Sequence, residues 1–245
     1  SGDGYKAISG DLRLPTLNEY TLRNKLKYRA EFIRLLFNIR GFDVVQLAGP
    51  FVLPFPAFPF KRILSFLKRN NGKVFLCACG SDSYYWKNSR ISLAYGPFDE
   101  TIKYDLNGVE PKQASEKAFS FNKYIADNVD GVIPVSYEYQ VGYRHHKNLR
   151  RLIPQPIDCS GVKHTSIDTK HNSINILHGV TRYGLKGTRH IAEAFSKLNH
   201  SYGTKATFLI KEKLSLDAYL NILKNVSIVV DQCYSLSYGM NALYS

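Results

Sequence analysis

The sequence predicts an α/β protein whose parallel sheets are divided between two lobes. Short apolar runs that can form buried strands alternate with segments whose apolar residues have helical spacing. Such alternation is typical of parallel strands joined by right-handed helical crossovers. It is interrupted once, at residues 155–172, where the chain is polar and has no periodicity. We therefore expect two Rossmann-like lobes joined by a linker, with an interdomain cleft and ligands at the carboxyl ends of the strands.

The first lobe is expected at residues 1–154. Its first helix is predicted by apolar residues that recur every three or four positions from Leu22 to Phe37, opposite a row of lysines and arginines. Gly41 should end this helix, and the stretch 83–112 is expected to be rich in loops. The predicted helices cover residues 20–40, 61–69, 116–128 and 137–146, and the predicted strands cover 42–47, 73–79, 131–135 and a short edge strand at 152–154.

A second, partial lobe is expected at residues 173–245, after the linker. Its predicted strands begin at Ile174 and cover 206–210 and 227–230, and its predicted helices cover 189–198 and 215–223. The single methionine is Met240, and the chain stops inside a predicted helix. We therefore expect material to be missing from both ends.

The charge of the chain limits its partners. The net charge is +13 with a pI near 9.5, which predicts attraction to nucleotides, phospholipid headgroups or nucleic acids. No apolar run reaches the length of about 18 residues that a membrane span needs, so a soluble or peripheral cytoplasmic protein is expected. The cysteines contain no Cys-x-x-Cys pair, which favours reduced thiols over a zinc site or a disulfide framework: Cys77, Cys79, Cys159 and Cys233.

The segment INILHGVTRYGLKGT, which begins at Ile174, predicts an anion site. A strand ends at Gly179, a short loop carries Arg182 and Lys186, and Gly187 opens the next helix. The first amides of a helix lack backbone acceptors and lie at the positive end of its dipole. Two cations beside such a terminus favour a diphosphate over a single carboxylate.

Asp82 is the candidate for contact with a second substrate. It follows the predicted strand 73–79 in a turn, beside Tyr84, Tyr85 and Trp86, whose rings could stack on a sugar. A carboxylate there could orient or deprotonate a hydroxyl. The alternative is an aspartate that only forms the turn. His178, at the end of a strand, is likewise either a ligand contact or a packed structural residue.

Six segments of the sequence resemble family-4 retaining glycosyltransferases of the GT-B fold. ILHGVTRYGLKGTRHIAEAFSKL and SIVVDQCYSLSYGMNAL are similar to the donor-binding lobe, and FDVVQL, CGSDSYYW, GVIPVSYEY and IPQPID are similar to the acceptor lobe. The resemblance implies that Arg182 and Lys186 hold the diphosphate of a UDP- or GDP-linked sugar. It also places the turn before the last helix near the sugar: Ser237, Tyr238, Gly239, Met240 and Asn241. GT-B enzymes usually need no metal, so none is expected.

The chain departs from this family pattern at several positions. Two glutamates usually flank the glycine-containing turn, and here Leu236 and Tyr244 stand in their places. A histidine that many relatives carry before the turn of Asp82 is Cys79 here. These departures keep an inactive or binding-only relative among the alternatives.

The resemblance implies transfer of a sugar, with retention, from a nucleoside diphosphate to a hydroxyl of a glycan or lipid-linked acceptor. A role in polysaccharide synthesis at the inner face of the plasma membrane would explain the basic helices at 20–40 and 61–69. One alternative is a nucleotide-sugar epimerase on the same scaffold. Another is a nucleic-acid-binding protein, although the sequence has no recognisable nucleic-acid-binding motif.

Overall fold

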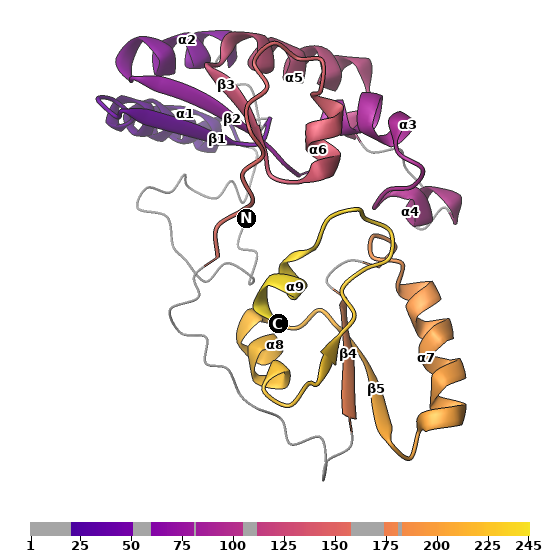
Figure 1. Ribbon diagram of the computed structural model, residues 1–245. Coiled ribbons are helices and arrows are strands. Elements are labelled where there is room, and N and C mark those ends of the chain that lie inside the picture. Colours follow the sequence, from indigo (N-terminus) through magenta and orange to yellow (C-terminus); the bar gives the residue numbers. More distant parts are fainter. Residues whose placement is uncertain (1–20, 51–59, 81, 105–111, 158–173, 181–182) are drawn as a thin grey trace. The chain divides into compact units, whose positions relative to one another are not determined.

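A computed structural model describes residues 21–50, 60–80, 82–104, 112–157, 174–180 and 183–245 (Figure 1). The chain divides into two compact units. The N-terminal unit holds the described residues as far as Ser92 and those from 112 to Pro154, and the C-terminal unit holds 93–104 and the described residues from Gln155 onward. The described residues of each unit form a three-stranded parallel sheet. The chain is therefore an α/β protein, as the sequence predicts.

The sheet of the N-terminal unit has the strand order β1-β2-β3. Val45 of β1 lies opposite Val74 of β2, and Leu76 of β2 lies opposite Val132 of β3. The strands are β1 (Val44–Ala48), β2 (Lys73–Ala78) and β3 (Gly131–Pro134), and the longer helices are α1 (Leu22–Asn38), α2 (Phe60–Asn70), α5 (Glu116–Asn128) and α6 (Tyr137–Gly142). These bounds confirm the elements predicted from periodicity to within a few residues, except that α6 ends earlier than expected.

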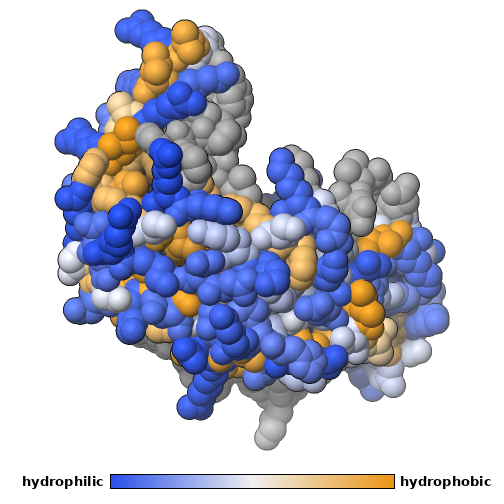
Figure 2. Space-filling view, turned by 90° about the horizontal axis from the view of Figure 1, so that it is seen from above, coloured by the Kyte–Doolittle hydropathy of each residue, from blue (hydrophilic) through white to orange (hydrophobic). Residues whose placement is uncertain are grey.

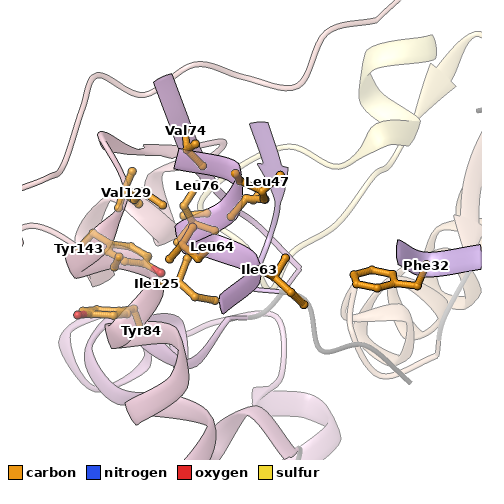
Figure 3. Close-up of a cluster of buried hydrophobic side chains, with 14 of the residues drawn as sticks. Phe32, Leu47, Ile63, Leu64, Val74, Leu76, Tyr84, Ile125, Val129 and Tyr143 are labelled. Carbon is orange, nitrogen blue, oxygen red and sulfur yellow. The ribbon is translucent and has the colours of Figure 1, made fainter. Parts of the chain in front are cut away.

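A hydrophobic cluster of described side chains forms the core of this unit (Figure 3). Val74 and Leu76 of β2 are fully buried, and Leu64 of α2 and Ile125 of α5 pack in the same cluster. Burial of apolar surface is the main favourable contribution to folding. The apolar residues that predict these elements in the sequence therefore form the core, and this core fixes the carboxyl ends of the strands.

The stretch expected to be rich in loops contains short helices instead. They are the π-helix η1 (Tyr85–Ser89), α3 (Arg90–Ser92), α4 (Asp99–Lys103) and the 3-10 helix η2 (Lys112–Ala114). Contacts with α6 stabilise η1, because the Ser89 hydroxyl donates to the Glu138 carbonyl at 2.5 Å and the Asn88 amide donates to the Gly142 carbonyl at 2.8 Å. The spacing of apolar residues does not reveal contacts between residues distant in sequence. The sequence therefore did not predict these helices.

The C-terminal unit is built around β4 (Ile174–Val180), which lies between β5 (Ala206–Glu212) and β6 (Ile228–Val229). Its helices are α7 (Thr188–Tyr202), α8 (Leu216–Leu223), α9 (Met240–Tyr244) and α4. Leu177 of β4, Ile191 and Phe195 of α7 and Tyr219 of α8 are buried. Parallel pairing brings the carboxyl ends of β4 and β6 to one edge of the sheet.

Two expectations differ from the structure. Residues 152–154 do not form an edge strand, because only the Ile153 amide bonds the Pro134 carbonyl there and the neighbouring pair Val132–Leu149 is an isolated bridge. Residues 93–104 group with the C-terminal unit, although they lie within the range expected for the first lobe. Most of the expected linker, residues 158–172, lies outside the described residues.

The face drawn in Figure 2 is mostly hydrophilic, with smaller hydrophobic areas among the polar side chains. Several large apolar side chains are exposed, including Leu22, Leu26 and Phe37 of α1. In the described part of the chain, no helix combines the length and the apolar character that a membrane crossing requires.

Candidate functional site

The carboxyl edge of the C-terminal sheet gathers most of the residues predicted to bind a donor. It is formed by the end of β4, the loop of residues 183–187, the first turn of α7 and residues 231–241, which follow β6 and lead into α9. We refer to residues 183–187 as the α7 loop. This edge is where ligands bind in open α/β sheets.

Gly187 sets the direction of the α7 loop as it enters α7. Its φ of +73° is left-handed, and a Cβ added there would lie 2.1 Å from the Cys233 Sγ. Within the described residues, the amides of Thr188, Arg189 and His190 have no hydrogen-bond acceptor, whereas the Ile191 amide bonds the Gly187 carbonyl. The start of α7 therefore keeps the unpaired amides and the positive dipole end that an anion site needs.

Lys186 lies at this helix start and is paired with an aspartate that the sequence analysis did not identify. Its Nζ donates to Asp231 Oδ1 at 2.6 Å, and both side chains are about nine-tenths buried. Asp231 Oδ2 accepts from the Gly239 amide at 2.5 Å. An ammonium has three protons, so one bond to Asp231 leaves Lys186 able to bind a second anion. Asp231 thus fixes the cation and ties it to the turn before α9.

The remaining predicted donor contacts lie in the same unit. The Asn241 side-chain amide donates to the Gly179 carbonyl at 2.8 Å, and a Cβ on Gly179 would approach that nitrogen to 2.7 Å. The Ser237 carbonyl accepts from Gln232 at 2.5 Å. The turn residues Tyr238 and Met240 are exposed. Arg182 lies outside the described residues, so its predicted contact with a diphosphate stays a prediction.

His178 is enclosed within the C-terminal unit. Its Nδ1 lies 2.7 Å from the Val230 carbonyl, and its Nε2 lies 3.0 Å from the Thr188 hydroxyl. A carbonyl only accepts, so Nδ1 carries the proton and Nε2 accepts from Thr188. Burial lowers the pKa of His178. This geometry supports the structural alternative, in which a neutral histidine connects β4 to the start of α7.

Asp82 lies in the N-terminal unit, with both carboxylate oxygens engaged inside the protein. Oδ1 accepts from the Tyr85 amide at 3.0 Å, and Oδ2 accepts from the Tyr143 hydroxyl at 2.9 Å. Only 1% of the residue is exposed. Burial raises the pKa of Asp82 to about 6, although these hydrogen bonds oppose the shift. The arrangement favours the turn-forming alternative at the start of η1, and contact with an acceptor hydroxyl stays a prediction.

The aromatic group beside Asp82 packs inward. Tyr84, Tyr85 and Trp86 are each at most 6% exposed, and the Tyr84 ring stacks on Tyr143 with centroids 4.0 Å apart. Stacking on an acceptor sugar would require these rings to leave the core. In the structure these three rings therefore act as core packing groups. Their contact with an acceptor sugar stays a prediction.

The described cysteines are free thiols, and the described residues hold no cluster of three metal-ligating side chains. Cys77 and Cys79 hydrogen-bond each other; the contact with Cys79 lowers the pKa of Cys77 to about 7. Cys159 lies outside the described residues.

Sequence reasoning missed two carboxylates of the C-terminal unit. A signal existed for Asp231, which directly follows the predicted strand 227–230. No signal existed for Glu100, which is fully buried in this unit although it lies far from the other residues in sequence.

Comparison with protein-family models and with curated proteins finds no match to this sequence.

Proposed function

We propose that the C-terminal unit binds the diphosphate of a nucleotide sugar and that the protein is a retaining glycosyltransferase of the GT-B type. One observation supports this most. Three features of an anion site lie together at the carboxyl edge of a parallel sheet: Lys186, the left-handed Gly187 and the unpaired first amides of α7. Among the described residues predicted to bind a donor, Asn241 is hydrogen-bonded to Gly179, and Lys186 is connected through Asp231 to Gly239.

The proposed reaction transfers the sugar to a hydroxyl that attacks from the face the diphosphate leaves. The bond from the anomeric carbon to the diphosphate oxygen breaks while a bond from the acceptor oxygen to that carbon forms. Negative charge grows on the departing diphosphate oxygen, which takes the proton of the acceptor hydroxyl. Lys186, held by Asp231, would stabilise this charge together with Arg182 and the α7 amides. A preorganised donor of this kind contributes on the order of 3 kcal/mol to lowering a barrier.

The test is a thermal-shift panel of pyrophosphate, nucleoside diphosphates and nucleotide sugars, because a ligand that binds the native state stabilises it by mass action. One nucleotide should stabilise the protein, and Arg182→Ala should remove the effect. Lys186→Met alone would leave Asp231 buried and unpaired, so the double variant Lys186→Met/Asp231→Asn keeps the site neutral. It should fold and fail to bind.

Lys224→Ala is the matched control, because Lys224 is an exposed cation of the same unit whose ammonium donates to the Asn221 side chain. It should leave the ligand-induced shift unchanged. Absence of a shift with every nucleotide, or steeply salt-dependent binding of DNA or RNA instead, would overturn the proposal. Conversion of a bound nucleotide sugar to an epimer without an acceptor would favour the epimerase alternative.

We also propose that α1 docks on anionic lipid. Apolar residues recur on one stripe of this helix, all of them exposed except the half-buried Ile33, and an exposed cation follows each of three stripe residues directly. The stripe comprises Leu22, Leu26, Ala30, Ile33 and Phe37, and the cations are Arg23, Lys27 and Arg34. Tyr28 and Phe32 are the helix residues buried in the core. Apolar anchors flanked by cations suit a lipid headgroup region.

Sedimentation with vesicles tests this docking. Vesicles that contain phosphatidylglycerol should retain the protein, and pure phosphatidylcholine vesicles should not. The double variant Leu22→Ser/Leu26→Ser should reduce retention, because it removes the exposed apolar anchors. Ile91→Ser/Leu198→Ser changes two exposed apolar residues elsewhere and is the control. Equal loss in both double variants would contradict a specific role for α1.

A further inference from the structure

Glu100 is a buried carboxylate without a hydrogen-bond partner among the described residues. It is 0% exposed, and neither Oε1 nor Oε2 is hydrogen-bonded to any of them. A carboxylate can only accept hydrogen bonds when ionised, and burying it without donors is unfavourable. Native proteins keep few such groups, and an exception calls for a physical explanation. Packing cannot be that explanation, because an apolar side chain would fill the same space without the cost.

The helix that carries Glu100 is attached to the α7 loop and to α7. The Thr101 hydroxyl donates to the Gly184 carbonyl at 2.8 Å, and Gly184 belongs to the α7 loop. The Tyr104 ring lies under the Arg189 guanidinium, 4.5 Å from it, and Arg189 is in the first turn of α7. Residues 99–104 are thus held against the loop that carries Lys186 and against the start of the helix that follows.

The neighbours of Glu100 place its carboxylate at the same edge. Burial raises the pKa of Cys233, and the charge of Glu100 raises it further. The Cys233 Sγ lies 3.7 Å from the Lys186 carbonyl and 3.6 Å from the Gly187 carbonyl. Glu100 therefore lies near the anion site, yet the Lys186 ammonium is bonded to Asp231 instead.

The edge therefore offers two complementary kinds of group. Unpaired amides and an ammonium suit a phosphate, and an unpaired carboxylate suits a group that donates hydrogen bonds. A vicinal diol, with two hydroxyls on adjacent carbons, can donate to both oxygens of one carboxylate. A nucleotide sugar contains a diphosphate and such diols in one molecule, on the ribose and on the sugar.

We propose that Glu100 accepts hydrogen bonds from a diol of the nucleotide sugar whose diphosphate binds at Lys186 and the α7 amides. This inference rests on the proposed function and adds the residue that holds the ligand's hydroxyls. It assigns to Glu100 a carboxylate role that neither Leu236, before α9, nor Tyr244, the last residue of α9, can fill. The carboxylate is left unpaired without ligand and is paired when the ligand binds.

The test compares Glu100→Gln with the unaltered chain in two thermal-shift measurements. Without ligand, the variant should melt at a higher temperature, because a neutral amide removes a buried unpaired charge. With a nucleoside diphosphate or a nucleotide sugar, its affinity should fall about tenfold or more, as expected for loss of a hydrogen bond to a charged group. Stabilisation by pyrophosphate, which has no hydroxyls on carbon, should stay unchanged.

Glu193→Gln is the matched control, since Glu193 is an exposed glutamate of α7 in the same unit. It should change neither the melting temperature nor the affinity. A 2′-deoxynucleoside diphosphate separates the two diols. If Glu100→Gln and the unaltered chain bind the 2′-deoxynucleoside diphosphate with equal affinity but differ for the ribonucleoside diphosphate, the ribose diol is the partner. If the difference appears only with the nucleotide sugar, the sugar diol is the partner.

Two results would overturn the inference alone: a lower melting temperature of Glu100→Gln without ligand, or equal affinity of both chains for every diol-containing ligand. Failure of the proposed function looks different. In that case the unaltered chain shows no shift with any nucleotide or with pyrophosphate, and the inference falls with it.

Discussion

Asp82 and Asp231 both follow the end of a strand, but their surroundings give them different properties. Asp231 faces the Lys186 ammonium and the Gly239 amide. Asp82 is bonded to the Tyr85 amide and the Tyr143 hydroxyl, and forms no salt bridge with a cation among the described residues. Neutral hydrogen-bond donors compensate a buried charge less well than an ion pair does, and burial accordingly raises the pKa of Asp82 to about 6.

Asp82 should therefore destabilise the protein as the pH rises. Its folded pKa of about 6 exceeds the unfolded value of 3.8, so the native state binds more protons between these values. Stability falls with increasing pH wherever the native state binds more protons. The free energy of unfolding of Asp82→Asn, relative to that of the unaltered chain, should therefore increase between pH 4 and pH 7. Above pH 7 the difference should stay constant at about 3 kcal/mol. Urea unfolding followed by Trp86, the single tryptophan, measures this in the N-terminal unit.

Asp130→Asn is the control of opposite sign. The bond from the Val74 amide lowers the pKa of Asp130, and nearby lysines add to the effect. A lowered pKa stabilises the fold above the unfolded pKa, and this stabilisation is lost as the pH falls. Asp130→Asn should therefore be less stable than the unaltered chain at pH 7 and approach it below pH 4. Parallel pH profiles for both variants would contradict the assignment of Asp82.

At the scale of elements, the sequence predicts what local periodicity encodes. The spacing of apolar residues predicts α5 and β4 nearly to their ends. It does not predict η1 or α4, whose contacts come from residues distant in the chain, such as Glu138 for η1 and Gly184 for α4. The same distinction applies to the residues of the site. The α7 loop that carries Lys186 is formed by residues close in sequence and was predicted, whereas Glu100 reaches this edge only through tertiary packing.

The entry into α7 depends on Gly187, and Gly187→Ala should destabilise the C-terminal unit. A left-handed φ is unfavourable for alanine, and the added Cβ would collide with the Cys233 Sγ. Strain and overpacking together should cost about 2 to 4 kcal/mol. Differential scanning calorimetry of the unit's transition measures the loss.

Two variants separate strain from collision. Gly41→Ala introduces alanine at a φ of +74° with open space around it, so it should show the strain alone. Gly187→Ala/Cys233→Ala removes the sulfur and should recover part of the lost stability. If the double variant is no more stable than Gly187→Ala, contact with Cys233 is not the cause.

At the scale of the whole molecule, the described residues contribute two separate segments of the chain to the C-terminal unit. Residues 93–104 belong to it, the chain then returns to the N-terminal unit at 112, and it enters the C-terminal unit again after Pro154. A fragment cut at the boundary expected from sequence would lack α4 and Glu100. Ligand binding therefore has to be tested on the full chain.

Each unit has its own sheet and its own buried side chains, so we expect two unfolding transitions in the full chain. Ser115 and Ser215 provide a matched pair of probes. Each caps a helix by accepting from the amide three residues on, at 3.2 Å for α5 and 3.3 Å for α8. Replacing such a cap by alanine costs about 1 kcal/mol.

Ser115→Ala should lower only the transition that Trp86 fluorescence reports, because Trp86 and α5 belong to the N-terminal unit. Ser215→Ala should lower only the other transition, which circular dichroism detects and Trp86 fluorescence does not. Calorimetry of both variants fixes the order of the two transitions. The opposite result is a single transition that both substitutions shift equally, which would mean that the two sheets fold as one cooperative unit.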